Sequence, residues 1–174
     1  MKVYKLTNQN MQTANNTQWG EGVTHTATGP LEMCENGFHA YPDPLMAVFM
    51  NPVHANIKNP KLFDSIGSGD KINGGTKLCF EKFTTVKEIP VPQLSTEQRV
   101  EIAIRLVLAT QTNLSESYKA WAENWLNGTD RTNESAAEYA ARAAEYAADI
   151  TKFTKQFIKI LHEVWHDSCT TISR

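Results

Sequence analysis

The sequence predicts an α+β protein, with a small, mainly antiparallel β module in residues 1–92 and a module of three or four helices in residues 93–174. Three observations predict this class. In the first half, apolar residues alternate with polar ones, as in strands; in the second half, they recur at helical spacing. Between the two halves, Pro90 and Pro92 cannot donate backbone hydrogen bonds, so no helix or central strand is expected to cross them.

Three short strands are predicted near the start, because β-forming residues stand between turn signals. They cover residues 2–6, 23–26 and 38–41. Asp43 followed by Pro44 is typical of an N-cap and a first helical position. This pair predicts a short apolar helix over residues 45–50, which we expect Asn51 and Pro52 to end.

The next part of the first half contains four glycines, which predict a loose loop over residues 67–75. Residues 76–89 give the best strand pattern, because apolar and polar residues interleave there. The pattern leaves open whether this is one strand or two strands with a break near Lys82.

The helical pattern of the second half begins with a capping box, in which Ser95 and Gln98 satisfy each other's backbone N–H groups. Ser115 can cap a second helix, on which Trp121 and Trp125 lie one turn apart and are expected to pack into the core. A helical stripe of apolar residues that runs from residue 150 to residue 164 predicts a last helix.

Between these helices, the sequence Glu-Tyr-Ala-Ala occurs at Glu138 and again seven residues later. We expect a third helix to begin at Thr132 or Asn133 and to contain this repeat. Small residues at this spacing predict either a helix seam inside the protein or a homodimer through this alanine-rich helix. The candidate interaction surface flanks the alanines, and its residues are Tyr139, Arg142 and Tyr146.

Composition and charge exclude several classes of protein. Of the 174 residues, 41% are hydrophobic and 21% are charged, and the net charge is −2, which matches neither a disordered chain nor a strongly basic nucleic-acid-binding protein. We find no signal-peptide pattern and no apolar run near the roughly 18 residues of a membrane span. Cys34, Cys79 and Cys169 are odd in number and far apart, which favours reduced thiols in a cytoplasm.

A series of short motifs runs through most of residues 1–150. The motifs are Thr17-Gln18-Trp19-Gly20, Gly22-Val23-Thr24-His25, His39-Ala40-Tyr41, Asp43-Pro44-Leu45, Ala47-Val48, Asn51-Pro52, His54-Ala55-Asn56, Thr84-Thr85, Ile89-Pro90, Thr96-Glu97-Gln98-Arg99-Val100, Trp121-Ala122 and Asp130-Arg131, before the alanine-rich segment. On these motifs, the chain resembles a family of phage and prophage proteins whose function is uncharacterised. The resemblance implies a small accessory protein that is made during phage infection or from a prophage and acts in the cytoplasm of the host cell.

Our first functional hypothesis is a non-enzymatic protein, without a cofactor, that binds a host protein, for instance in counter-defence or host takeover. No complete catalytic motif is found, and the charge is close to neutral. In the front module, polar and aromatic residues of the kind that line ligand clefts are the pocket candidates. They are Trp19, His39, Tyr41 and His54.

The second hypothesis is an enzyme related to ADP-ribosyltransferases that binds NAD. The segment from Gly37 through the Asp43 cap to the short helix is similar to a core segment of that fold, in which a strand and a helix line the nicotinamide pocket. A catalytic carboxylate would come from a late strand, as Glu81 or Glu88. The alternative is a structural turn in which Asp43 only caps the helix.

The third hypothesis is a zinc-dependent hydrolase. His162, Glu163 and His166 match the H-E-x-x-H pattern, in which two histidines one turn apart bind zinc and the glutamate activates water. A further ligand would have to come from the front half, as His39, His54 or Cys34. The alternative is a helix end whose histidines interact favourably with the helix dipole.

Overall fold

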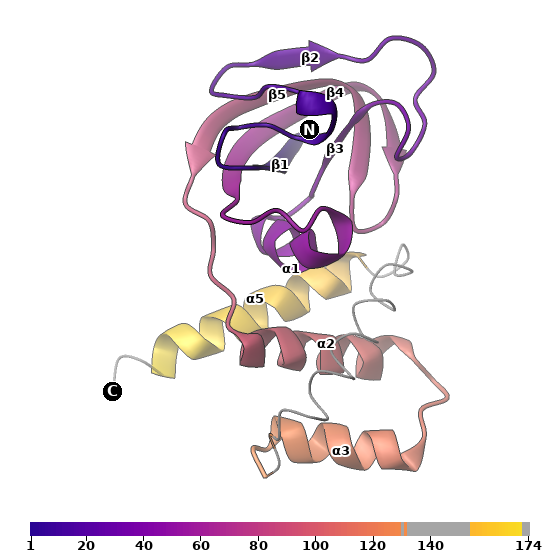
Figure 1. Ribbon diagram of the computed structural model, residues 1–174. Helices are drawn as coiled ribbons and strands as arrows, with labels where there is room; N and C mark the ends of the chain where they lie inside the picture. The colour runs from indigo at the N-terminus through magenta and orange to yellow at the C-terminus, as the bar shows by residue number, and fades with distance from the viewer. Residues whose placement is uncertain (130, 132–153, 172–174) are drawn as a thin grey trace. The chain divides into compact units, whose positions relative to one another are not determined.

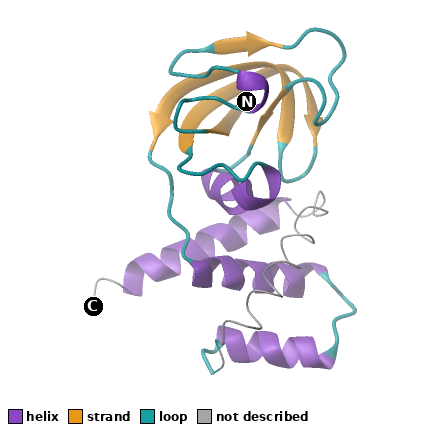
Figure 2. Ribbon diagram, in the orientation of Figure 1, coloured by secondary structure: helices purple, strands orange, loops and turns teal. Residues whose placement is uncertain are grey.

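The chain divides into two compact units, Met1–Gln93 and Leu94–Arg174. The computed structural model describes residues 1–129, 131 and 154–171 (Figure 1). The first unit holds a five-stranded antiparallel sheet with one helix, and the described part of the second unit is helical, so the predicted α+β class is confirmed (Figure 2).

The sheet of the first unit is formed by β1 (Lys2–Thr7), β2 (Thr24–Thr26), β3 (Phe38–Ala40), β4 (Lys61–Asn73) and β5 (Leu78–Ile89). The strand order is β1-β4-β5-β2, and β3 pairs with the first residues of β5. Tyr4 and Tyr41 exchange two backbone hydrogen bonds of 2.8 Å each. This bridge links β1 to the residue that follows β3, so β1, β4, β5 and β3 form a closed ring.

One cluster of buried side chains in the core of the first unit consists of Val3, Trp19, Ala40, Leu78, Phe80 and Phe83. A 3-10 helix, η1 (Ala14–Asn16), lies in the loop between β1 and β2. The same loop contains Trp19, which is buried although it belongs to no strand.

The expectation of a loop over residues 67–75 is wrong, because β4 continues to Asn73. A Cβ atom at Gly67 would lie 2.6 Å from the ring of Phe80, so a glycine is needed where this ring covers the strand. Gly69 has a φ of 73° and lies within the register shift between Ser68 and Lys71. These glycines therefore mark a close approach and a bulge, and do not end the strand.

The segment predicted as residues 76–89 forms one strand, β5, without a break at Lys82. One edge of β5 pairs with β4 along most of the strand. The other edge pairs with β3 near the start of β5 and with β2 further along. β5 is therefore the strand that connects most of the sheet.

Helix α1 (Pro44–His54) begins as predicted, because the Asp43 carboxylate accepts hydrogen bonds from the N–H groups of Leu45 and Met46. The expected end at Asn51 and Pro52 is wrong, since the helix continues to His54. Asn51 holds the chain after the helix, because its side chain exchanges two hydrogen bonds with the backbone of Ile57 (2.9 and 3.0 Å). The extra turn places His54 on the same helix as the Asp43 cap.

The described helices of the second unit are α2 (Thr96–Thr110), α3 (Glu116–Leu126) and α5 (Thr154–Thr171). The capping box of Ser95 and Gln98 is present, and Ser115 caps α3 through the N–H of Tyr118. The core between α2 and α3 contains the buried side chains of Val100, Ile104, Ala122 and Trp125, with Trp121 half-buried beside them. The stripe predicted for the last helix is buried at Phe157, Ile160, Leu161 and Val164.

No helix in the described ranges combines the length and the apolar character that crossing a membrane requires. The predicted third helix, the alanine-rich repeat and the candidate surface of Tyr139, Arg142 and Tyr146 lie outside the described residues.

Candidate functional site

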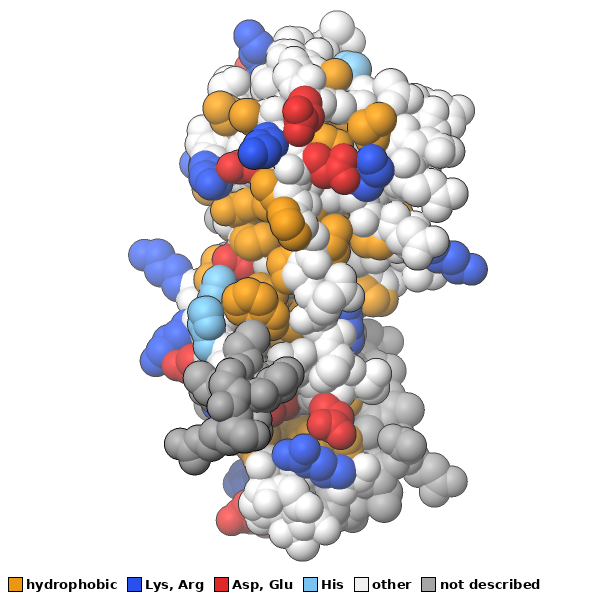
Figure 3. Space-filling model, turned by 90° about the vertical axis from the view of Figure 1, so that its left-hand side faces the viewer, with side chains coloured by type: hydrophobic (Ala, Val, Ile, Leu, Met, Phe, Trp, Pro, Cys, Tyr) orange, Lys and Arg blue, Asp and Glu red, His pale blue; other side chains and the backbone are white. Residues whose placement is uncertain are grey.

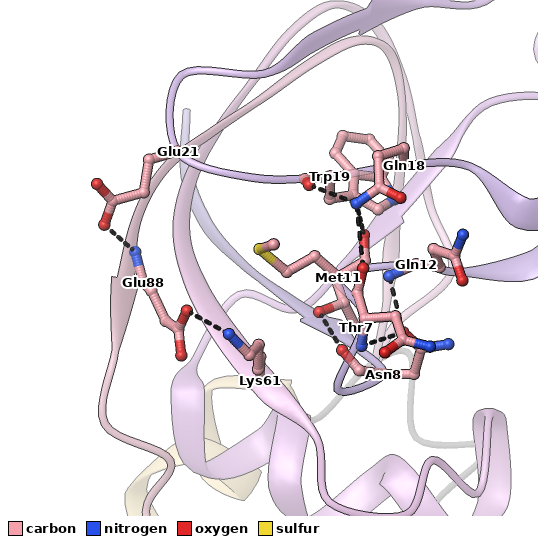
Figure 4. A network of polar contacts seen from close by, with 10 residues as sticks. Thr7, Asn8, Met11, Gln12, Gln18, Trp19, Glu21, Lys61 and Glu88 are labelled. Atoms are coloured by element: carbon pink, nitrogen blue, oxygen red, sulfur yellow. Dashed lines mark hydrogen bonds and ion pairs between the residues drawn. The ribbon is translucent and has the colours of Figure 1, made fainter.

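The loop between β1 and β2 is held in one shape by its own polar side chains (Figure 4). Asn8 Oδ1 accepts the N–H groups of Asn10 and Gln12, both at 2.9 Å. Gln18 Nε2 donates to the carbonyl groups of Asn10 and Trp19, both at 3.1 Å. Since these bonds satisfy the loop backbone, the loop can present the Trp19 side chain to the core in a defined position.

Trp19 is only 2% exposed and forms the centre of an aromatic group. Its ring meets the rings of His25, Phe38 and Phe83 edge to face, with centroid distances of 4.6, 5.7 and 5.5 Å. The indole N–H donates to Thr13 Oγ1 at 2.8 Å. The structure therefore places this pocket candidate in the core, with its polar atom satisfied.

Lys5 is a buried lysine on β1, 7% exposed. Its ammonium group donates to the carbonyl oxygen of His39 at 2.8 Å and lies over the rings of Trp19 and Phe83, 4.8 and 5.5 Å from their centroids. Burial penalises the charged form and lowers the pKa of Lys5 to about 8. The aromatic rings and one carbonyl group stabilise the charge that remains.

His39 lies on β3 opposite Cys79 of β5. Its Nε2 accepts the backbone N–H of Cys34 at 3.1 Å, so a neutral His39 carries its proton on Nδ1. Burial lowers the pKa of His39 to about 4, and the charges of Lys77, Lys5 and His54 act in the same direction. His39 is therefore a neutral imidazole near pH 7, and its electrostatic neighbours are basic side chains.

Tyr41 and His54 form a pair between the end of β3 and the end of α1. Their rings stack at a centroid distance of 5.8 Å, and a hydrogen bond of 3.1 Å joins the phenol oxygen to His54 Nδ1. Burial raises the pKa of Tyr41. Burial, followed by the charge of Lys77, lowers the pKa of His54 to about 4.

Lys77 and Cys34 complete this part of the molecule. Lys77 precedes β5, is half-buried, and donates to the sulfur of exposed Cys34 at 3.1 Å. The chain at Cys34 has a φ of 71°, in the left-handed region. We call Lys5, His39, His54 and Lys77 the basic cluster. None of the groups that shift the pKa values of Lys5, His39 and His54 is a carboxylate.

The carboxylates proposed for catalysis form contacts elsewhere. Glu81 Oε2 accepts the N–H of Asp70 at 3.1 Å, at the bulge of β4. Glu88 pairs with Lys61 at 3.0 Å, and its own N–H donates to Glu21 Oε1 at 3.1 Å (Figure 4). The structure thus brings together His39, Tyr41 and His54, while the contacts of Glu81 and Glu88 hold the β4–β5 pair and the loop at Glu21.

The H-E-x-x-H residues lie on α5 as predicted by their spacing. The rings of His162 and His166 stack at 6.0 Å, and Glu163 forms an ion pair of 3.5 Å with Lys159, one turn earlier. Among the residues that the structure describes, no three His, Cys, Asp or Glu side chains are grouped so that they could hold a metal ion. The zinc alternative stays a prediction for these residues.

Two members of the basic cluster, Lys5 and Lys77, were not among the residues that the sequence marked as pocket candidates. A signal for Lys5 was available, because residues two apart in a strand lie on the same face, and Lys5 therefore shares a face with the apolar Val3. No such signal exists for Lys77, whose contact joins residues 43 positions apart.

A family model described as "Domain of unknown function (DUF7666)" matches residues 1–97, which include the whole basic cluster. No curated protein and no solved structure matches the chain.

Proposed function

Because the chain belongs to the DUF7666 family of domains of unknown function, we propose a function from its geometry: it binds a negatively charged group of a partner, without catalysis. One observation carries this proposal. The basic cluster gathers two lysines and two histidines, and among the described residues neither lysine forms an ion pair with a carboxylate. Such a site attracts an anion but lacks the acidic partner of an acid–base pair.

Outside the cluster, several charged side chains of the first unit are paired with opposite charges. On the face drawn in Figure 3, basic and acidic side chains are interspersed. In the first unit, Lys2 pairs with Asp64 and Lys61 pairs with Glu88, both at 3.0 Å. Exposed charges that are paired in this way attract a partner weakly. Half-buried charges without an acidic neighbour are screened less by water and salt, so they select a charged partner more strongly.

We propose further that the partner is a protein of the host cell and that the chain is an accessory protein of a phage or prophage. The resemblance of its motifs to such proteins supports this. The positions of Glu81 and Glu88 also favour binding over ADP-ribosyl transfer, because their carboxylates form contacts with Asp70 and Lys61.

Affinity capture from host-cell lysate with the full chain tests this function. We expect a host protein that is recovered with the unchanged chain and reduced about tenfold or more with a Lys77→Gln, His54→Gln double variant, since the loss of a half-buried charged donor and of a neutral imidazole donor costs about 1.4 kcal/mol or more. Lys82→Gln is the matched control, because Lys82 is exposed on β5 and outside the cluster. Circular dichroism shows whether the double variant stays folded.

Two results would contradict this function. In the first, the double variant stays folded and recovers the same proteins as the unchanged chain. In the second, the chain transfers labelled ADP-ribose from NAD to a host protein and Glu81→Gln abolishes the transfer, which would make it an enzyme of the second class.

A further inference from the structure

The basic cluster lies where four segments of the first unit meet. Lys5 comes from β1, His39 from β3, His54 from the end of α1, and Lys77 from the turn before β5. Hydrogen bonds connect three of them, from Lys5 to the His39 carbonyl, from Cys34 N–H to His39 Nε2, and from Lys77 to Cys34 Sγ. His54 joins the same group through Tyr41, which lies two residues after His39 and whose phenol oxygen is 3.1 Å from His54 Nδ1.

Three further polar side chains interact with members of the cluster, and none of the three is a carboxylate. They are the phenol of Tyr41 and the thiols of Cys34 and Cys79. Burial raises the pKa values of Tyr41 and Cys79, so both stay neutral at pH 7. Lys5 and Lys77 therefore supply two ammonium charges, which donate to the His39 carbonyl and to Cys34 Sγ, and among the described residues neither forms an ion pair with a carboxylate.

Part of the cluster can be reached from solvent. His39, His54 and Lys77 are half-buried, and Cys34 is exposed, whereas Lys5 is buried. The neutral His39 has a donor at Nδ1, since its Nε2 is already an acceptor. When Tyr41 donates to His54 Nδ1, His54 has a donor at Nε2. Lys77 has three N–H donors, of which one is used for Cys34.

We infer that Lys77, His39 and His54 bind a phosphate dianion, either inorganic phosphate or the phosphate monoester of a larger ligand, with Lys5 as a second, buried positive charge. This inference rests on the proposed function and names the group that the site recognises. Two ammonium charges are balanced by one dianion. Donors from separate segments suit a tetrahedral acceptor, whereas a planar carboxylate is matched best by the fork of an arginine, which the cluster lacks.

Titration of the full chain with inorganic phosphate, followed by the ring resonances of its five histidines, tests the inference. We expect the resonances of His39 and His54 to move with a saturable curve, while those of His25, His162 and His166 stay in place. Lys77→Gln should weaken binding about tenfold, as the loss of a charged donor predicts, and Lys82→Gln should leave it unchanged. The amide spectrum of each variant reports that it is folded.

Four other ligands define the chemistry of the site. Sulfate, also a tetrahedral dianion, is expected to bind, and acetate at the same concentration is not. Sulfate should bind about threefold tighter at pH 5 than at pH 7, because an anion raises the pKa values of neighbouring histidines and its binding takes up protons. Phosphoserine and AMP, tested side by side, show whether the monoester belongs to a protein or to a nucleotide.

The inference is overturned if the His39 and His54 resonances do not respond to phosphate or sulfate, or if acetate shifts them equally. The proposed function is tested separately by the capture experiment. If the cluster variant loses capture but the unchanged chain does not bind phosphate, this inference is overturned and the proposed function stands. Phosphate binding together with unchanged capture would overturn the proposed function and leave this inference standing.

Discussion

Trp19→Ala is expected to destabilise the first unit by about 3–5 kcal/mol, the range measured for large aromatic side chains that are removed from a core. The ring of Trp19 is 2% exposed and packs edge to face against His25, Phe38 and Phe83. Its loss leaves a cavity and removes the ring that lies over the Lys5 ammonium group. Urea unfolding, followed by the amide resonances of β5, measures the change.

Two further substitutions serve as controls for this result. Trp19→Phe keeps much of the apolar ring but loses the hydrogen bond to Thr13, so we expect a cost of about 1–2 kcal/mol. Val86→Ala removes an exposed side chain on the same sheet and should change the free energy of unfolding by less than about 0.5 kcal/mol. If Trp19→Ala cost no more than Val86→Ala, Trp19 would not be part of the core of the folded unit.

Lys5→Met is expected to stabilise the protein at pH 7, by about 1–2 kcal/mol. The lowering of the Lys5 pKa from 10.5 to about 8 corresponds to about 3 kcal/mol of cost for burying the charge. Methionine has a similar length and no charge, although it loses the contacts with the Trp19 ring and the His39 carbonyl, which offset part of the gain. Urea unfolding of both proteins at pH 7 measures the difference.

The pH dependence identifies the cause of this difference. Between pH 8 and 10.5, Lys5 is protonated in the unfolded chain and mostly deprotonated in the folded one, so the unfolded state binds more protons. The free energy of unfolding of the unchanged protein should therefore rise with pH across this window, relative to that of Lys5→Met. A constant difference between the two proteins from pH 7 to 10.5 would contradict the buried charge.

Local sequence patterns predicted the parts of the fold that depend on neighbouring residues. The caps at Asp43, Ser95 and Ser115 are present, because each needs only the next turn of backbone. The extent of α1 was missed, because the rule that proline disfavours a preceding helical residue is a preference. Asn51 instead binds the backbone of Ile57 with its side chain and remains within the helix.

The strand β4 was missed for a different reason. Its glycines look like loop residues in the sequence, but Gly67 is required by the ring of Phe80, a residue of the neighbouring strand. Tertiary contacts of this kind override local propensity and cannot be seen from one segment.

The candidate site was predicted in part. His39, Tyr41 and His54 were predicted as polar and aromatic residues of one module; in the structure Tyr41 lies two residues after His39 and is hydrogen-bonded to His54. Lys77 joins them through Cys34, and this contact depends on how the loop before β3 and the turn before β5 approach each other. The carboxylates Glu81 and Glu88 were selected by strand position alone, which does not tell whether a side chain faces the site or a neighbouring strand.

The central claim is that His39 and His54 lie in a basic site without a carboxylate partner. The pH titration of the histidine ring resonances of the unliganded chain tests this claim most directly. Our account predicts that His39 and His54 titrate near pH 4, well below the usual value of about 6.5, because burial and the charge of Lys77 oppose protonation of both, and the charge of Lys5 also opposes that of His39. Titration of both histidines at or above pH 6.5 would contradict it, since that result requires either full solvation or a negative charge beside them.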